Sequence, residues 1–454
     1  MDPIGEAPIG RPGCHSRQPD RLALAWVGVK PGGAQAAVLV ALLCAAAGCA
    51  SGAAAPSGRP HLSSPRPSSA AGAAGAVSRQ LPGCTSATQP GRTLPASATT
   101  MTTPARLPAG ETAHGPFGVA VTAAGHWGFA SIPASDGNGS DLEVLRLEPG
   151  HAAKLAHVVP VPGPMAGATL SKNGKLLLVA DGTGASVISV PVAERGGKHP
   201  VLGMLAAPGG PSADSAIEVA VTPDDRYAFV SLEGAGAIAV FDLATAMTRG
   251  FGASGVYVGS VPTPDGPVGL AVSPDGRWLY STAEQATGPG RLGAVSVISV
   301  VRAESDPGAS VVAQVPAGCS PVRVITSSDG DVVWVTARGS NALLAFSAVR
   351  LRTDSAHALL ADVQVGQAPV GLALARGGAL LVVADSDRFA TGLPPGNLAV
   401  VDAADALRGR PSLVGYLSAG RFPRDVAASG DGGLVLVANY GSGQVETVDP
   451  AALP

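Results

Sequence analysis

Five titratable side chains stand just before, or at the start of, short apolar segments. They are His114, Glu218, Arg323, Arg424 and Asp425, and matching positions elsewhere carry Gly or Ala, as in GPFGVAV and APVGLAL. A carboxylate can act as a general base near neutral pH, and an arginine can stabilise the oxyanion that develops when a carbonyl is attacked. These residue types therefore allow acid–base chemistry on a carbonyl compound, provided that the fold brings them together.

The same residues also have an ordinary structural explanation. Glu218, Arg323 and Arg424 could pair with one another around a polar opening, or hold ordered water there. Asp425 directly follows Arg424, so we expect a local ion pair between them. No local catalytic motif accompanies these residues, because the chain contains neither a GxSxG nor an HExxH pattern.

Residues that could hold a metal or a redox group are scattered. No CxxC pair is present, and no histidine or cysteine lies at the spacing that zinc or haem requires. The sequence DGNGSD begins at Asp136 and is as rich in oxygen ligands as part of a calcium loop, but it lacks the glutamate twelve positions after the first ligand. We therefore expect no metal and no cofactor.

The elements that carry these residues belong to a repeat of about fifty residues. A tight turn between two apolar runs recurs seven times, and proline, aspartate and glycine in it favour a β-hairpin. The turns are TAAGH (122–126), SKNGK (171–175), TPDDR (222–226), SPDGR (273–277), SSDGD (327–331), ARGGA (375–379) and SGDGG (429–433). Each predicts the first two strands of one unit.

Each unit continues with a third strand, and six of the seven also have a fourth. The seventh unit stops at Pro454 after its third strand, VETVDP, while a matching strand, MTTPARLPAG (101–110), precedes the first unit. A ring of four-stranded blades closes when one blade takes strands from both ends of the chain. The sequence therefore predicts an all-β, seven-bladed β-propeller over 101–454, in which the N-terminal strand completes the last blade. An open array of hairpins or a β-sandwich is the alternative.

The N-terminal part of the chain predicts export. A 14-residue apolar run, Ala34–Ala47, follows Arg17, Arg21 and Lys30, which is typical of a signal segment over 1–48 with an over-long start. Ala46, Ala47, Gly48 and Cys49 resemble a bacterial lipobox, in which the cysteine is acylated. The resemblance implies an anchor at Cys49 on the outer side of the cytoplasmic membrane, while simple cleavage with secretion, or an uncleaved anchor, is the alternative.

Residues 49–100 are rich in Ala, Ser, Pro and Gly, and we interpret them as a disordered tether. Cys84 and Cys319 would be the thiols left in an exported, acylated chain, so a disulfide between them is one possibility. The formal net charge is -3, and the 30 basic residues form no run. We therefore expect no binding to nucleic acid. We also expect a monomer.

Three segments are similar to a known repeat: VANYGSGQVETVDP (437–450), VSLEGAGAIAVFDL (230–243) and PVGLAVSPDGRWLY (267–280). They resemble the YVTN-type β-propeller repeat of YncE-like surface and periplasmic proteins, over roughly residues 101–450. Lactonase-type propellers and propeller domains of redox proteins share this repeat, so the resemblance implies a fold more than an activity.

One face of such a propeller gathers the unusual connections. Long second-to-third connections occur in blade 1 (131–140), blade 4 (283–292) and blade 6 (384–396), and insertions of this kind often form a binding face. This face would carry Asp136, Glu284, Arg388 and Phe389 beside the five titratable residues. We expect a binding or scaffolding module whose protein or small-molecule partner is unknown. A lactone hydrolase that uses Glu218 with Arg323 or Arg424, and His114 as a second candidate, is the alternative.

Overall fold

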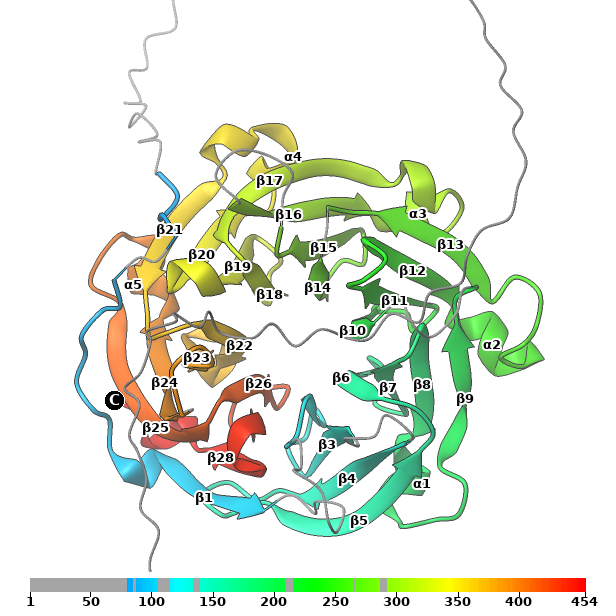
Figure 1. The fold of residues 1–454 in the computed structure, drawn as a ribbon, viewed down its shortest axis with the longest axis horizontal. Coiled ribbons are helices and arrows are strands. Elements are labelled where there is room, and N and C mark those ends of the chain that lie inside the picture. Colours follow the sequence, from blue (N-terminus) through cyan, green and yellow to red (C-terminus); the bar gives the residue numbers. More distant parts are fainter. Residues whose placement is uncertain are drawn as a thin grey trace, which may run out of the picture. The chain divides into compact units, whose positions relative to one another are not determined.

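The computed structural model describes residues 80–84, 87–104, 115–133, 139–208, 215–264, 266–285, 292–392 and 394–454, without the side chains of 101–104. All of them belong to one compact unit, Ala73–Pro454. They form seven four-stranded antiparallel sheets arranged as blades around a central channel (Figure 1). The predicted seven-bladed β-propeller is therefore confirmed. The signal segment and Cys49 lie outside the described residues.

Blades 1 to 6 follow one another along the chain, and in each blade the strands run outward from the channel in chain order. Blade 1 has β2 (Val119–Val121), β3 (Trp127–Pro133), β4 (Ser140–Arg146) and β5 (Lys154–Val161). Blade 2 has β6 (Met165–Leu170), β7 (Leu176–Asp181), β8 (Gly184–Ser189) and β9 (Val201–Ala206). Blade 3 has β10 (Ala216–Val221), β11 (Tyr227–Leu232), β12 (Ala237–Asp242) and β13 (Tyr257–Pro262).

The next three blades repeat this arrangement. Blade 4 has β14 (Pro267–Val272), β15 (Trp278–Ala283), β16 (Leu292–Ser299) and β17 (Val311–Cys319). Blade 5 has β18 (Pro321–Thr326), β19 (Val332–Ala337), β20 (Ala342–Ser347) and β21 (Leu359–Gln364). Blade 6 has β22 (Pro369–Ala375), β23 (Leu380–Asp385), β24 (Pro395–Asp402) and β25 (Leu413–Arg421).

Blade 7 closes the ring with strands from both ends of the chain. β26 (Pro423–Ala428), β27 (Val435–Asn439) and β28 (Gln444–Val448) are followed outward by β1 (Thr99–Pro104). β1 pairs with β28 antiparallel, with Thr100 opposite Thr447 and Pro104 opposite Gln444. The predicted closing strand over 101–110 is thus present, although it begins at Thr99, two residues earlier, and the described strand ends at Pro104.

The turns between the first and second strands form as their composition predicts. In blade 4 the Ser273 hydroxyl donates to the Asp275 carboxylate at 2.5 Å and accepts from the Trp278 amide at 3.0 Å. Gly276 has a φ of +73°, which a residue with a side chain rarely adopts. The same bonds recur around Asp224, Asp329 and Asp431. They fix the register of the two inner strands of these blades.

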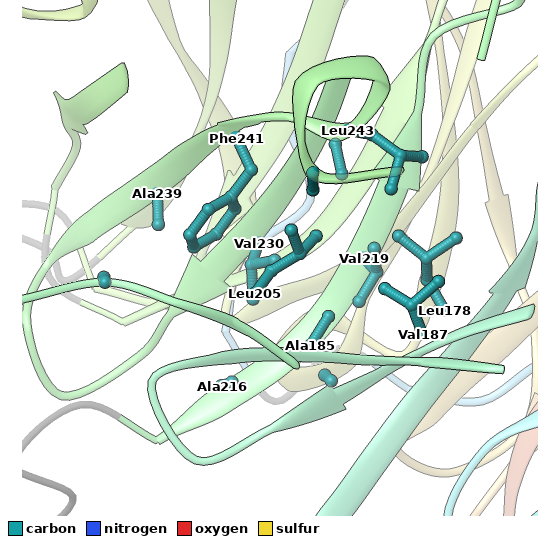
Figure 2. Close-up of a cluster of buried hydrophobic side chains, with 14 of the residues drawn as sticks. Leu178, Ala185, Val187, Leu205, Ala216, Val219, Val230, Ala239, Phe241 and Leu243 are labelled. Atoms are coloured by element: carbon teal, nitrogen blue, oxygen red, sulfur yellow. The ribbon is translucent and has the colours of Figure 1, made fainter. Parts of the chain in front are cut away.

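Apolar side chains fill the space between neighbouring blades. Between blades 2 and 3, Leu178 and Val187 pack with Val230 and Phe241, and all four are fully buried (Figure 2). Burying side chains of this size contributes roughly 1.5–3 kcal/mol each. The runs of successive apolar residues in the sequence are explained by this packing, because both faces of each inner strand are covered.

Hydroxyl groups also link one blade to the next. Ser231 of β11 accepts from the Glu218 amide in its own blade at 3.0 Å and donates to the Val268 carbonyl of blade 4 at 2.8 Å. Thr336 of β19 links the Arg323 amide to the Val370 carbonyl in the same way. Ser131 and Thr282 make the matching bonds in blades 1 and 4. These bonds hold the main chain of Glu218 and Arg323, whose charged side chains enter the channel, in a fixed position.

Short helices connect the third strand to the fourth, and sequence reasoning did not predict them. The connections that carry α2 and α3 pack on the outermost strand of the preceding blade: Phe251, after α2, lies against Gly203 of blade 2, and Pro307, after α3, lies against Gly259 of blade 3. The α-helices are α1 (Val190–Glu194), α2 (Leu243–Arg249), α3 (Val300–Ala303), α4 (Arg350–Thr353) and α5 (Ala403–Leu407). The 3-10 turns are η1 (Ala96–Ala98), η2 (Pro307–Ala309), η3 (Arg338–Ser340), η4 (Ser355–His357), η5 (Arg376–Gly378), η6 (Tyr440–Ser442) and η7 (Pro450–Ala452). None of the helices in the described ranges is long and apolar enough to cross a bilayer.

The segment 87–98, which we name the strap, corrects the predicted extent of the tether. Its Leu94 amide donates to the Tyr416 carbonyl of β25 at 2.8 Å, the Tyr416 amide donates to the Arg92 carbonyl at 2.9 Å, and Leu94 is 4% exposed. The strap thus covers the outer strand of blade 6. In blades 2 and 3 the outer strand is instead covered by the connection between the third and fourth strands of the next blade. Blade 7 lacks that connection because its fourth strand comes from the N-terminus. A disulfide joins Cys84 to Cys319 at the end of β17, with 5.3 Å between the Cα atoms.

Candidate functional site

The innermost strands of the seven blades share one position that faces the channel. Four blades carry glycine there, at Gly118, Gly167, Gly269 and Gly371, whereas blades 3, 5 and 7 carry Glu218, Arg323 and Asp425. A Cβ at Gly167 would lie 3.0 Å from both carboxylate oxygens of Glu218. At least at Gly167, glycine therefore leaves room for the charged side chain of the next blade.

Glu218, Arg323 and Asp425 meet in the channel, and we name them the axial trio. Arg323 Nη1 lies 2.8 Å from Glu218 Oε2, and Arg323 Nε lies 3.3 Å from Asp425 Oδ1. The second oxygen of Asp425 accepts from the Val119 amide of blade 1 at 3.0 Å. Arg323 and Asp425 are each 7% exposed. The trio therefore links alternate blades across the channel through buried ion pairs, of which the one between Arg323 and Asp425 is also a hydrogen bond.

The predicted local ion pair between Asp425 and Arg424 is wrong, because Asp425 pairs with Arg323 instead. Successive side chains of a β-strand point to opposite faces. Arg424 therefore leaves the strand in a different direction from Asp425, although the two are adjacent in sequence.

The environment of the trio shifts its proton affinities. Burial raises the pKa of Glu218 to about 7; Arg323 and Arg424 oppose this shift, and the like charge of Asp425 adds to it. Burial works against the charge of Arg323, but Glu218 and Asp425 together raise the pKa of its guanidinium. Arg323 is therefore a permanent cation held between two carboxyl groups, one of which can take up a proton near neutral pH.

An apolar layer lies next to the trio, on the side of the connections between fourth and first strands. Its residues each precede the position of the trio by one residue in the innermost strands. Val268, Val322 and Val370 form a small buried cluster there, with Ile217 packed against it. Arg424 occupies the same strand position in blade 7, and its guanidinium carbon lies 3.5 Å from the centre of the Phe117 ring of blade 1. Most of this layer is thus apolar, and its one described cation stacks on an aromatic ring.

Arg424 lies among aromatic rings, and no salt bridge joins it to an acid in the described part of the chain. The Tyr440 and Phe422 rings lie 5.6 and 5.7 Å from its guanidinium carbon. Burial lowers the pKa of Arg424 to about 9, and the like charges of Arg323 and Arg388 add to the effect. Its Nε is buried and makes no hydrogen bond to any described residue.

The connections of blades 4, 5 and 6 bring further predicted residues together. Arg338 Nη2 lies 2.7 Å from Glu284 Oε2. The Phe389 ring is centred 5.6 Å from the Arg338 guanidinium carbon and 5.5 Å from that of Arg388. Phe389 itself is 72% exposed. Glu284, Arg388 and Phe389, predicted from the long connections, therefore do lie near one another, on the face that also carries Arg424.

Not every relevant residue was found from the sequence. His114 and Asp136 were predicted for this face but lie outside the described residues. Arg338 was missed because it follows β19 in a connection of ordinary length. Phe117, Phe422 and Tyr440 were missed as well, although an aromatic residue where other blades carry a small or β-branched one was a usable signal for Phe117.

Comparisons with known proteins agree with this fold. A family model described as Lactonase, 7-bladed beta-propeller matches residues 134–390. No curated protein matches the chain. Among solved structures, the hydrazine synthase of Kuenenia stuttgartiensis has 18% sequence identity and a TM-score of 0.57, over 75% of this chain and 97% of that one. At this identity the similarity concerns the fold.

The raised pKa of Glu218 predicts a specific pH dependence of stability. The folded protein holds a proton on Glu218 up to pH about 7, whereas the unfolded chain releases it near 4.5. The free energy of unfolding should therefore fall as the pH rises from 4.5 to 7, by on the order of 3 kcal/mol. Glu218→Gln should remove that loss, as measured by urea unfolding across this range. Glu148→Gln, at an exposed residue, is the control, and equal pH slopes for Glu218→Gln and the unmodified chain would contradict the assignment.

Proposed function

The chain belongs to the Lactonase, 7-bladed beta-propeller family, and we propose that it uses this propeller to bind a partner. The binding face is the one that carries the long connections of blades 1, 4 and 6. The observation that carries the proposal is Phe389, which is 72% exposed and whose ring lies within 5.6 Å of the guanidinium carbons of both Arg338 and Arg388. Exposed aromatic rings and arginines are the side chains that contribute most to protein interfaces. A protein or small-molecule partner would bury this group.

The axial trio supports the binding function over catalysis. A general base must reach the proton that it removes, and a cation that stabilises an oxyanion must be free to receive it. Here the two carboxylates and Arg323 bind one another, one residue deeper than the apolar layer. Arg388 and Arg424 remain nearer the face, where they stack on Phe422 at 5.0 and 5.7 Å.

A lactone hydrolase is the second candidate function, and one observation favours it. Glu218 has a pKa of about 7 and lies 2.8 Å from Arg323, so a base poised near neutral pH stands beside a cation. Such a site requires the trio to open when the substrate binds.

We further propose that the propeller is exported, held at a membrane by an acylated Cys49, and built on YVTN-type repeats. The apolar run before Cys49 and the repeat segments support this proposal. The disulfide between Cys84 and Cys319 is compatible with an oxidising compartment.

The binding function can be tested at Phe389. With a photo-crosslinking amino acid in place of Phe389, we expect a discrete cross-linked product in cells that make the chain, because the ring is at the centre of the proposed contact. Arg338→Ala together with Arg388→Ala should remove this product. The matched control carries the cross-linker at Val301 of α3, which is 70% exposed on the opposite face. Identical products from positions 389 and 301 would refute a specific binding face.

The hydrolase is tested by proton release from a panel of sugar and acyl lactones. We expect the full chain to give no turnover above buffer, since the trio is closed and buried. Turnover that both Glu218→Gln and Arg323→Ala abolish, in variants that still melt cooperatively, would establish the hydrolase and displace the binding function from first place.

The anchor is tested with two cysteines of the same segment. Cys49→Ser should abolish acylation, detected by mass spectrometry, and move the protein from the membrane fraction to the soluble fraction. Cys44→Ser, five residues earlier in the apolar run, should leave both unchanged. Acylated, membrane-bound Cys49→Ser protein would exclude the predicted lipobox.

A further inference from the structure

Two arginines on the face of the long connections lack an acidic partner. Arg388, in the long connection of blade 6, and Arg424, in β26, form no salt bridge and no hydrogen bond with any described residue. Both are half-buried, so each has lost part of its hydration without gaining an ion pair. Arg338 on the same face differs, because Glu284 lies 2.7 Å from its Nη2 and neutralises it.

The two guanidinium groups stand near one another. Their carbons lie 5.0 and 5.7 Å from the centre of the same ring, Phe422. Burial, and then the like charges of Arg323 and Arg388, lower the pKa of Arg424 to about 9. Burial and the like charge of Arg338 also lower the pKa of Arg388. Cations held together in this way repel one another, and an anion placed between them would remove that repulsion.

Aromatic rings surround Arg424 without using its donors. Its guanidinium carbon lies 3.5 Å from the centre of the Phe117 ring, which is van der Waals contact, so no N–H group stands between the carbon and that ring. The Phe422 and Tyr440 rings complete the surroundings at 5.7 and 5.6 Å. An arginine has five N–H donors in one plane, and the buried Nε of Arg424 has no acceptor among the described residues. The donors of Arg424 are thus left for a ligand.

The shared ring, Phe422, is held in an unfavourable backbone conformation. Its φ is +47°, which a bulky residue rarely adopts, and it is 6% exposed. The same position before the proline of the innermost strand is taken by Ser320 in blade 5 and by Ala368 in blade 6. A smaller residue would therefore serve the turn. Phenylalanine here instead supplies the ring beside which both arginines stand, and strain of this kind gathers at functional sites.

The other charges of this face decide which anion fits. Besides Glu284, the described acid that senses these arginines is Glu233, which is exposed and forms no salt bridge with a described residue. Three arginines, Arg338, Arg388 and Arg424, thus face two acids, which leaves an excess of one positive charge. The axial trio beneath them adds no further positive charge, because two carboxyl groups flank its arginine. A singly charged carboxylate balances the excess, whereas a doubly charged phosphate would exceed it.

We propose that Arg388 and Arg424 together bind a carboxylate whose attached apolar group covers Phe389. This inference rests on the binding function proposed above and names the chemistry of its ligand. Phe389 directly follows Arg388, its ring lies 5.5 Å from the Arg388 guanidinium carbon, and it is 72% exposed. The carboxylate belongs either to a free organic acid or to an acidic residue or chain end of a protein partner, and both sources present the same two oxygens to the arginines.

The probe for the test is phenylacetate, which joins a carboxylate to an aromatic ring, and its neutral counterpart is phenylacetamide. By titration calorimetry we expect the full chain to bind phenylacetate saturably, and the amide roughly tenfold more weakly or worse. Arg424→Gln and Arg388→Gln, in protein that still melts cooperatively, should each weaken phenylacetate binding by a similar factor. Absence of saturable binding, equal affinity for acid and amide, or tighter binding of phenyl phosphate would overturn the carboxylate site.

The matched control is Arg421→Gln, the same substitution at an exposed arginine that ends β25 on the same side of the propeller. It removes one positive charge without touching the proposed site, so it should bind phenylacetate like the unmodified chain. Equal weakening by Arg421→Gln and Arg424→Gln would reduce the effect to net charge and overturn the proposal.

The cross-linker at position 389 separates this inference from the proposed function and identifies the source of the carboxylate. If Arg424→Gln removes both phenylacetate binding and the cross-linked product, the carboxylate belongs to a protein partner. If it removes phenylacetate binding alone, the carboxylate belongs to a free organic acid. A cross-linked product in a chain that does not distinguish acid from amide would overturn the carboxylate site and leave the binding face, and phenylacetate binding without a product would do the reverse.

Discussion

Everything in this structure depends on the pairing of β1 with β28. Each blade is a single sheet, and it can bury its two faces only against the neighbouring blades. Without its fourth strand, the seventh blade would leave an exposed edge and the ring would stay open. The closing strand also decides what happens at blade 6. Since blade 7 has no connection from its third strand to a fourth, the strap 87–98 covers β25 in its place. The Cys84–Cys319 disulfide then fixes a residue that precedes the strap to the end of β17.

The sequence was sufficient for the ring because its signals are local and repeated. Turns such as SPDGR fix the first hairpin of a blade by bonds within five residues, and seven copies give the blade number. The short helices and the strap gave no such signal. α1 to α5 contain four to seven residues each, too few for a helical period, and their packing is decided by the preceding blade. Leu94 is buried because the strap packs on β25 of blade 6, and that contact cannot be read from the residues around Leu94.

The sequence predicted which residues enter the channel, but the ion pair that it predicted between Asp425 and Arg424 was wrong. Comparison of equivalent positions identified Glu218, Arg323 and Asp425, because each replaces a glycine of the repeat. Which of them pair depends on alternation along a strand and on distances across the channel, and neither is visible in a sequence. Adjacency suggested Arg424 as the partner of Asp425, whereas the structure uses Arg323, 102 residues away in the chain.

The same three substitutions of glycine divide the channel into two chemically different ends. On the side of the long connections, Arg388 and Arg424 lie among aromatic rings. On the side of the turns, half-buried apolar residues such as Leu170 and Ile325 line a cavity together with polar residues such as Lys172 and Ser328. Between these ends Arg323 forms both ion pairs of the trio, and its Nη2 makes no hydrogen bond to any described residue. The repeat fold thus acquires a buried cluster of charges where three of its seven blades replace the glycine that the other four carry.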